Sequence, residues 1–332
     1  MTKPNQQPPQ PANIDYRAGV VPGWVREVIE THFAIEAEDA KSAGSLGFMT
    51  RALVIATMPY KDPKADVFKR ENGDFRLRIF AGYEGGIPFG IYPRLLMSWV
   101  TTEAVRTQSP NIELGDSLSH FLRDVLDLKR SGGARGTSTR VAEQMKRLFG
   151  SLITAQYTGA MQERGFMLKN IVIADNIEFY ERDLKLDPKQ NPDSPDDPLW
   201  TPQATDEAGR WRSRVRLSEA FFRECISKPV PIDLRAYKAL RGSPLAMDLY
   251  TWLTYRMSYT ERRTRPIPWE ALMGQFGSNY STPRASRDFR RAFEKALKTV
   301  KVVYPRANVQ ANDCGIVLLP SPPHVMRQTA LF

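Results

Sequence analysis

One amphipathic segment, residues 283–304, constrains the fold of this chain more than any other. At about 100° per residue, five cations fall on one narrow helical face. These are Arg284, Arg287, Arg291, Lys295 and Lys298. The opposite face is apolar and consists of Phe289, Phe293, Ala296, Leu297 and Val300. Pro283 suits the first turn, where its missing N–H is not needed. The segment therefore predicts a helix, Pro283–Val300, that docks on a core by its aromatic face.

A hairpin is predicted directly after this helix. The β-branched run Lys301–Tyr304 ends at Pro305 and is typical of a strand. A turn around Asn308–Asp313 and the apolar run Ile316–Leu319 complete the pattern. A stripe of five cations matches a phosphate backbone in a groove, although a plain solvated face has the same pattern.

Composition favours a polyanionic partner without proving one. The chain has 332 residues, with 47 Lys and Arg against 37 Asp and Glu, for a formal charge of +10. No apolar run approaches the roughly 18–20 residues of a membrane span, so we expect no membrane partner. Two cysteines form neither a disulfide framework nor a zinc site, and residues 1–13 do not resemble a secretion signal. We therefore expect a cytoplasmic protein.

The order of predicted elements repeats along the chain. In the first half, helices Tyr92–Thr107, Ser117–Leu128 and Thr139–Leu152 precede two β-rich runs, Ile153–Thr158 and Phe166–Tyr180. Thr137, Ser138 and Thr139 are expected to cap the third of these helices. The second half repeats helices and a hairpin, with helices predicted at Leu234–Leu240, Pro244–Tyr259 and Trp269–Phe276 before the cationic one. This order is that of a winged helix.

We therefore predict an α+β fold of two tandem winged-helix domains, mainly helical with β-hairpin wings. The expected divisions are a disordered Pro/Gln-rich tail (1–23), a first winged-helix domain for oligomerisation and backbone contacts (24–182) and a Pro/Asp-rich linker (183–211). A second winged-helix domain for the main DNA recognition (212–322) and a C-terminal tail (323–332) follow.

Enzyme chemistry finds little support in the residues. His32, His120 and His324 are isolated, and no phosphate-binding GxxxxGK[ST] loop is present. Asp124 and Asp127 lie beside basic residues, which favours surface ion pairs over a metal site. We expect no catalytic residue, no metal and no cofactor. A DNA nickase or primase is the less favoured alternative.

Several segments resemble the plasmid-encoded replication initiators of the RepA family. They are PRLLMSWVTTEAVRTQSPNIELGDSLSHFL (Pro93–Leu122), VRLSEAFF (Val215–Phe222), PVPIDLRAYKAL (Pro229–Leu240), SPLAMDLYTWLTYRM (Ser243–Met257), IPWEALMGQFG (Ile267–Gly277) and GIVLLPSPPHV (Gly315–Val325). The resemblance covers roughly residues 24–325, and the TrfA proteins are more distant relatives.

The resemblance implies a protein that binds direct repeats (iterons) in a plasmid origin, opens the duplex and recruits host proteins. Those partners would be DnaA, the replicative helicase and the sliding clamp. It also implies a monomer–dimer equilibrium, in which dimers repress the initiator's own gene and contribute to copy control. A winged-helix transcriptional repressor without initiator activity is the alternative.

The expected DNA contacts centre on the cationic helix, because arginine pairs bidentately with guanine and lysine contacts phosphate. They comprise Arg284, Arg287, Arg290, Arg291, Lys295 and Lys298, with Ser281, Thr282 and Ser286 at the helix start. The first domain would add Arg140, Gln144 and Arg147. The cluster Arg262, Arg263 and Arg265 could touch phosphate or be a solvated helix end.

The end of the sequence resembles a sliding-clamp docking peptide of the form Q-x-x-L-F. Gln328 would bond the rim of an apolar pocket that Leu331 and Phe332 fill. Thr329 departs from the pattern, where an apolar residue is common. A tail that folds back on its own domain is the alternative.

Overall fold

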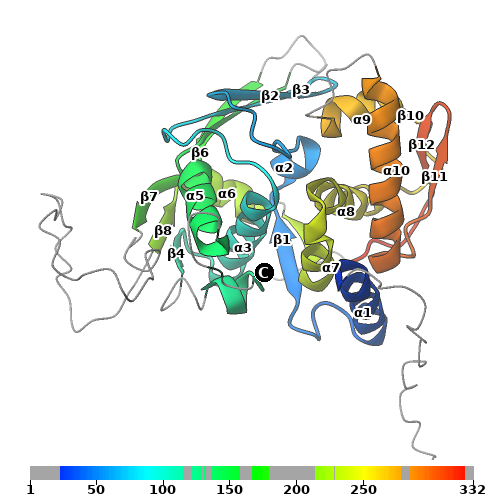
Figure 1. Cartoon of the computed structure of the whole chain (residues 1–332), viewed down its shortest axis with the longest axis horizontal. Coiled ribbons are helices and arrows are strands. Elements are labelled where there is room, and N and C mark those ends of the chain that lie inside the picture. The colour runs from blue at the N-terminus through cyan, green and yellow to red at the C-terminus, as the bar shows by residue number, and fades with distance from the viewer. Residues whose placement is uncertain are drawn as a thin grey trace, which may run out of the picture.

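The computed structural model describes residues 23–114, 121–128, 131, 136–157, 167–178, 214–227, 229–277 and 284–325. These residues form a mixed α+β fold with several small antiparallel sheets, which confirms the predicted class (Figure 1). The predicted linker 183–211 lies outside the described residues, as does nearly all of the tail 1–23. Ser281, Thr282, Gln328, Leu331 and Phe332 lie outside them too.

The second half of the chain builds three helices around one apolar centre, with a small sheet beside them. The helices are α8 (Pro244–Met257), α9 (Trp269–Phe276) and α10 (Ala285–Val303). The strands are β10 (Ile267–Pro268), β11 (Val309–Asn312) and β12 (Gly315–Leu318), in the order β10-β12-β11. Ser243 caps α8 by accepting a hydrogen bond from the Ala246 N–H at 3.2 Å, and Pro244 follows it.

The strand predicted at Lys301–Tyr304 is wrong, because α10 continues to Val303. Val300 and Val303 are buried three residues apart, in register with Phe293. Packing of that face outweighs the modest helix propensity of the β-branched residues. The hairpin consequently begins later, at Val309.

A glycine sets where β12 begins. Gly315 has a φ of +149°, and a Cβ on it would lie 1.9 Å from the Ile267 carbonyl oxygen. Only glycine lets β10 approach β12 so closely. The Asn312 side chain supports the turn by accepting from the Cys314 and Gly315 N–H groups at 3.0 and 2.9 Å.

The first half combines helices with a four-stranded sheet. Its helices are α2 (Arg51–Ile55), α3 (Ile91–Thr107) and α5 (Thr137–Phe149), with a short π-helical turn at Phe121–Val125. The sheet has the order β2-β3-β5-β6, formed by β2 (Val67–Asn72), β3 (Phe75–Phe80), β5 (Leu152–Tyr157) and β6 (Met167–Val172). The hairpin predicted after the third helix is present as β5 and β6. The predicted run Phe166–Tyr180 is not one strand, because β6 ends at Val172 and Ala174–Glu178 belongs to another sheet.

The predicted cap of α5 is wrong in its details. The helix already begins at Thr137, and the capping position is Gly136, which has no side chain to accept a hydrogen bond. Ser131 instead accepts from the Thr137 N–H at 2.9 Å, from outside the helix.

A second sheet combines strands from both halves of the chain, and the order of the strands in the sheet differs from their order in the sequence. Strand β8 (Arg214–Leu217) lies between β4 (Asn111–Glu113) and β7 (Ala174–Glu178). Helix α6 (Glu219–Ser227) then packs on α3. Residues 214–227, which the sequence assigned to the second domain, thus complete the first half.

Conversely, the N-terminal elements of the described chain pack against the second half. Helix α1 (Gly23–Ala37) packs on α7 (Leu234–Ala239) and α10, and β1 (Leu46–Met49) pairs with β9 (Val230–Asp233). Figure 1 shows α1 beside α7 and α10, far from the α5 side of the molecule. The predicted boundaries follow chain order, whereas the packing interleaves the two halves. Among the described residues, no helix is long and apolar enough to cross a membrane.

Candidate nucleic-acid interface

The cationic stripe of α10 is presented to solvent. Arg284, at the N-cap, and Arg287, Arg291, Lys295 and Lys298 on the helix are all exposed. None of the five forms an ion pair with another described residue. Ser286 is exposed in the first turn. Such side chains keep their donors available for an anionic ligand.

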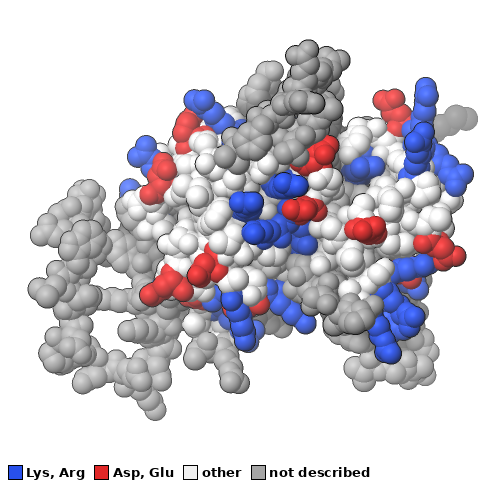
Figure 2. All heavy atoms as spheres, turned by 90° about the horizontal axis from the view of Figure 1, so that it is seen from above, with Lys and Arg blue, Asp and Glu red and all other residues white. Residues whose placement is uncertain are grey.

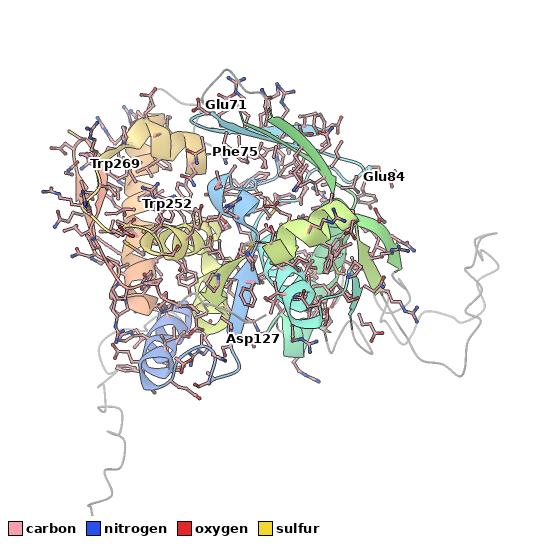
Figure 3. All side chains as sticks on the ribbon, turned by 180° about the vertical axis from the view of Figure 1, so that it is seen from behind. Glu71, Phe75, Glu84, Asp127, Trp252 and Trp269 are labelled. Carbon is pink, nitrogen blue, oxygen red and sulfur yellow. The ribbon has the colours of Figure 1, made fainter. Side chains whose placement is uncertain are left out.

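Aromatic packing fixes the helix beneath this stripe. Phe293 is fully buried and meets Trp269, Phe276 and Phe289 edge-on or tilted, with ring centroids 5.6 to 5.7 Å apart. Trp252 of α8 contacts Phe276 in the same cluster. Figure 3 shows Trp252 on α8 and Trp269 at the start of α9, beside the hairpin. The cations therefore stand on a rigid support.

Arg290 differs from the other cations of α10 because it is bound within the protein. Its Nε donates to Glu294 at 2.9 Å, and its two terminal nitrogens donate to Asp313 Oδ1 at 3.2 Å each. Its guanidinium also lies over the Trp269 ring, 5.2 Å from the centroid. The hydrogen bonds to Glu294 and Asp313 raise the pKa of Arg290. This residue joins α10 to the turn of the β11–β12 hairpin.

A second basic cluster runs beside the hairpin. Arg262, Arg263 and Arg265 are exposed, and Thr264 between them bonds β12. The Thr264 N–H donates to the Leu318 carbonyl at 2.9 Å, and its hydroxyl accepts from the Leu318 N–H at 3.0 Å. Figure 2 shows Lys and Arg side chains on the side of the molecule where α10 and this sheet lie, and others over the middle of the same face.

The corresponding helix of the first half is largely covered. Gln144 of α5 is buried, and its side-chain oxygen accepts from the Phe89 N–H at 2.8 Å. Arg147 pairs with Glu143 at 3.0 Å and Asp62 at 3.3 Å, and it lies over the Phe89 ring. These contacts engage both side chains within the protein.

Arg140 is the member of the α5 set that stays exposed. The sequence could not separate it from Gln144 and Arg147, because the segment that covers them, residues 82–90, has no helical or strand periodicity. Its four glycines and one proline gave no sign that it folds over α5.

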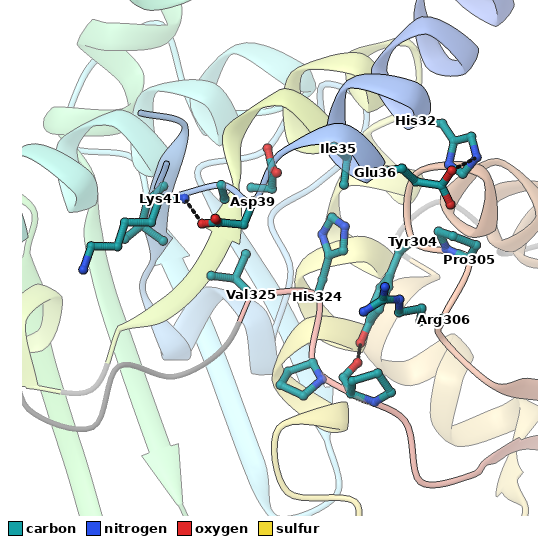
Figure 4. A pocket seen from close by; sticks show the side chains of 15 residues that line it. His32, Ile35, Glu36, Asp39, Lys41, Tyr304, Pro305, Arg306, His324 and Val325 are labelled. Carbon is teal, nitrogen blue, oxygen red and sulfur yellow. Dashed lines mark hydrogen bonds and ion pairs between the residues drawn. The ribbon is translucent and has the colours of Figure 1, made fainter. Parts of the chain in front are cut away.

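A pocket of about 710 Å³ lies at the C-terminal end of α10 (Figure 4). It is lined by the end of α1, the turn after α10 and the C-terminal segment that reaches Val325. On this segment, His324 Nδ1 lies 2.6 Å from the Tyr250 hydroxyl, which also accepts from the Asp233 N–H. Burial lowers the pKa of His324 to about 4. His32 and Glu36 of α1 line the pocket too.

The described residues hold no cluster of His, Cys, Asp or Glu that could bind a metal ion. Cys225 is buried and Cys314 is exposed at the tip of the hairpin. Among these residues, the most distinct chemical feature is the row of unpaired cations on α10.

A family comparison agrees with the resemblance seen in the sequence. The family described as plasmid encoded RepA protein matches residues 87–191 and 196–270, more than half of the chain.

The chain belongs to the plasmid-encoded RepA family.

This membership makes the chain a plasmid replication protein. In this RepA protein the matched residues run from the start of α3 to the start of α9, and α10 and the hairpin follow after them. No curated protein and no solved structure matches the chain.

Proposed function

We propose that this RepA protein initiates plasmid replication by binding iterons in the plasmid origin through α10 and the β11–β12 hairpin. In this proposal α8, β10, α9, α10 and the hairpin form a winged helix, with α10 in the major groove. The observation that carries it is a stripe of five exposed cations that form no ion pair with another described residue, on a helix that is followed by a hairpin.

The order β10-β12-β11 supports the winged-helix assignment, because the short strand before α9 pairs with the second strand of the hairpin. In the first half, α3, the turn Phe121–Val125, α5 and the β5–β6 hairpin follow a related order. There β4 pairs with β8 rather than with the hairpin, so that half departs from the simple pattern. We propose that it contributes Arg140 and the dimer surface.

The basic cluster Arg262, Arg263 and Arg265 would contact phosphates that flank the groove. Ser286 lies at the start of α10, where helix N–H groups and a hydroxyl favour a phosphate. Ser281 and Thr282 remain candidates for the same role.

We further propose that the protein opens the origin, recruits DnaA and the helicase, and represses its own gene. We propose that it does so without catalysing a reaction. The tail carrying Gln328, Leu331 and Phe332 is proposed to dock on the sliding clamp. Deleting the last five residues should abolish capture of the purified clamp and leave iteron binding intact; capture that survives the deletion would remove the tail from this role.

The deciding experiment combines binding with replication. A footprint on the origin of the protein's own plasmid should show protected direct repeats. The gene supplied in trans should restore replication to a plasmid that lacks it. Protection of an inverted repeat only, with no replication, would favour the repressor alternative. Single-strand cleavage or primer synthesis by the purified protein would favour an enzyme.

A further inference from the structure

The turn of the β11–β12 hairpin carries the wrong charge for a surface that approaches DNA. Among residues 309–318, the only charged side chain is Asp313, and it is 98% exposed. An unpaired carboxylate at this position would repel a phosphate backbone. The structure pairs it with Arg290 of α10, so the negative charge is compensated from inside the module.

Three contacts hold the same turn against the helices. Arg290 donates to Asp313 with both terminal nitrogens, while the indole N–H of Trp269 donates to the Asn312 carbonyl at 3.0 Å. Trp269 also carries the Arg290 guanidinium on its ring. The guanidinium is held from a third side by Glu294, one turn along the helix. A side chain bound in this way has few donors left for a phosphate.

We propose that Arg290 is a positioning residue, which sets the angle between α10 and the hairpin through Asp313 and does not itself bind DNA. This inference rests on the proposed function, because it assumes that α10 and the hairpin meet the same duplex. It removes Arg290 from the contacts expected from the sequence. It also gives Asp313 a favourable role in binding a polyanion.

The consequence is opposite in sign to simple electrostatics. Removing an exposed acid near a DNA-binding surface normally strengthens binding, because repulsion falls. Removing Asp313 should weaken binding, since the hairpin loses its fixed angle to α10. An exposed ion pair holds the hairpin only weakly, so we expect a modest loss of affinity, about two- to fivefold.

The test measures the affinity of the full chain for an origin-repeat duplex across a range of salt concentrations. Asp313→Ala and Arg290→Gln should each weaken binding, with the larger loss in Arg290→Gln because it leaves the Asp313 carboxylate unpaired. The double variant should bind about as well as Asp313→Ala. The slope of log affinity against log salt should stay unchanged in Arg290→Gln. Lys298→Ala should lower that slope by about one unit.

Asp288→Asn is the matched control, because Asp288 is an exposed acid in the first turn of α10. It should bind DNA as tightly as the wild type or more tightly. Unchanged or tighter binding by Asp313→Ala would overturn the proposal, as would a lower salt slope in Arg290→Gln.

A hydroxyl-radical footprint separates positioning from a general loss of stability. With Asp313→Ala, protection should fade where the hairpin lies and persist where α10 lies. An equal loss over the whole site would contradict the proposal. If the wild type does not bind the repeats at all, the proposed function fails instead, and the two failures are therefore distinguishable.

Discussion

The guanidinium of Arg94 on α3 donates to both carboxylate oxygens of Asp248 on α8, at 2.9 and 2.7 Å, inside the protein. The carbonyls of Met58, Pro59 and Gly90 accept its remaining hydrogen bonds. The Arg94 side chain is only 1% exposed. One fully bonded ion pair thus connects the two halves of the molecule.

Breaking this pair should destabilise the whole fold. Asp248→Asn leaves the Arg94 charge buried without its counter-ion, and the free energy of unfolding should fall by about 3–5 kcal/mol. Urea unfolding followed by circular dichroism measures the loss. Glu103→Gln is the control, because Glu103 pairs with the exposed Arg106. It should change stability by less than about 1 kcal/mol. A loss in Asp248→Asn as small as in the control would contradict this role.

Acid should loosen the C-terminal segment through His324. Burial lowers its pKa to about 4, so between about pH 6.5 and 4 the unfolded chain binds a proton that the folded chain does not. The stability from the neutral imidazole is complete above about pH 6.5 and is lost as the pH falls toward 4. At about 1.4 kcal/mol for each unit of pKa, the loss is roughly 3 kcal/mol.

Comparison of the wild type with His324→Gln at several pH values measures this effect. Tyr250 can still bond the glutamine, so the variant should fold and have a flatter stability profile between pH 4 and 6.5. Equal slopes in wild type and His324→Gln would refute the assignment.

The cations of α10 should separate into two classes on DNA. Arg287→Ala should cost about 1–3 kcal/mol of binding and relax sequence preference, as expected for a base contact. Lys298→Ala should weaken binding to all sequences and reduce the salt dependence. Arg223→Ala, on α6 and paired with Glu219, serves as a control without effect. Normal iteron binding by both α10 variants would exclude this helix from the interface.

The two cysteines give a probe of the hairpin without any substitution. Burial raises the pKa of the Cys225 thiol to about 12, so it should not react with a thiol reagent in the folded protein. Cys314 is exposed in the turn and should react. Bound origin DNA should slow this reaction when the hairpin lies on the duplex. An unchanged rate, with binding confirmed in the same sample, would place the hairpin away from DNA.

Local pattern predicted individual elements well where one face is apolar. The helix at Trp269–Phe276 has the predicted bounds, and the helix predicted at Pro244–Tyr259 ends only two residues earlier, at Met257. The exposed face of α10 was also predicted correctly. Each of these features depends on side chains that lie within a few turns of one another.

Features that depend on distant segments were missed. The last turn of α10 forms because Val303 is buried in the core, which overrides the β-branched pattern of Lys301–Tyr304. Gln144 and Arg147 look like a solvent-facing set until the segment at Phe89 covers them. The pairing of β8 with β4 joins strands about 100 residues apart, for which the local sequence contains no signal.

The position of α1 in the fold means that its packing depends on segments that are synthesised later. A ribosome produces α1 before α7 and α10, yet its buried residue Val28 belongs to a surface completed only by those two helices. The carbonyls of Ala34 and Glu38 likewise accept hydrogen bonds from Arg235, which follows about two hundred residues later in the chain. The nascent chain therefore cannot pack α1 in its final place until α7 and α10 have been synthesised. A copy whose translation stops early would lack α10 and would also leave α1 without its packing partner.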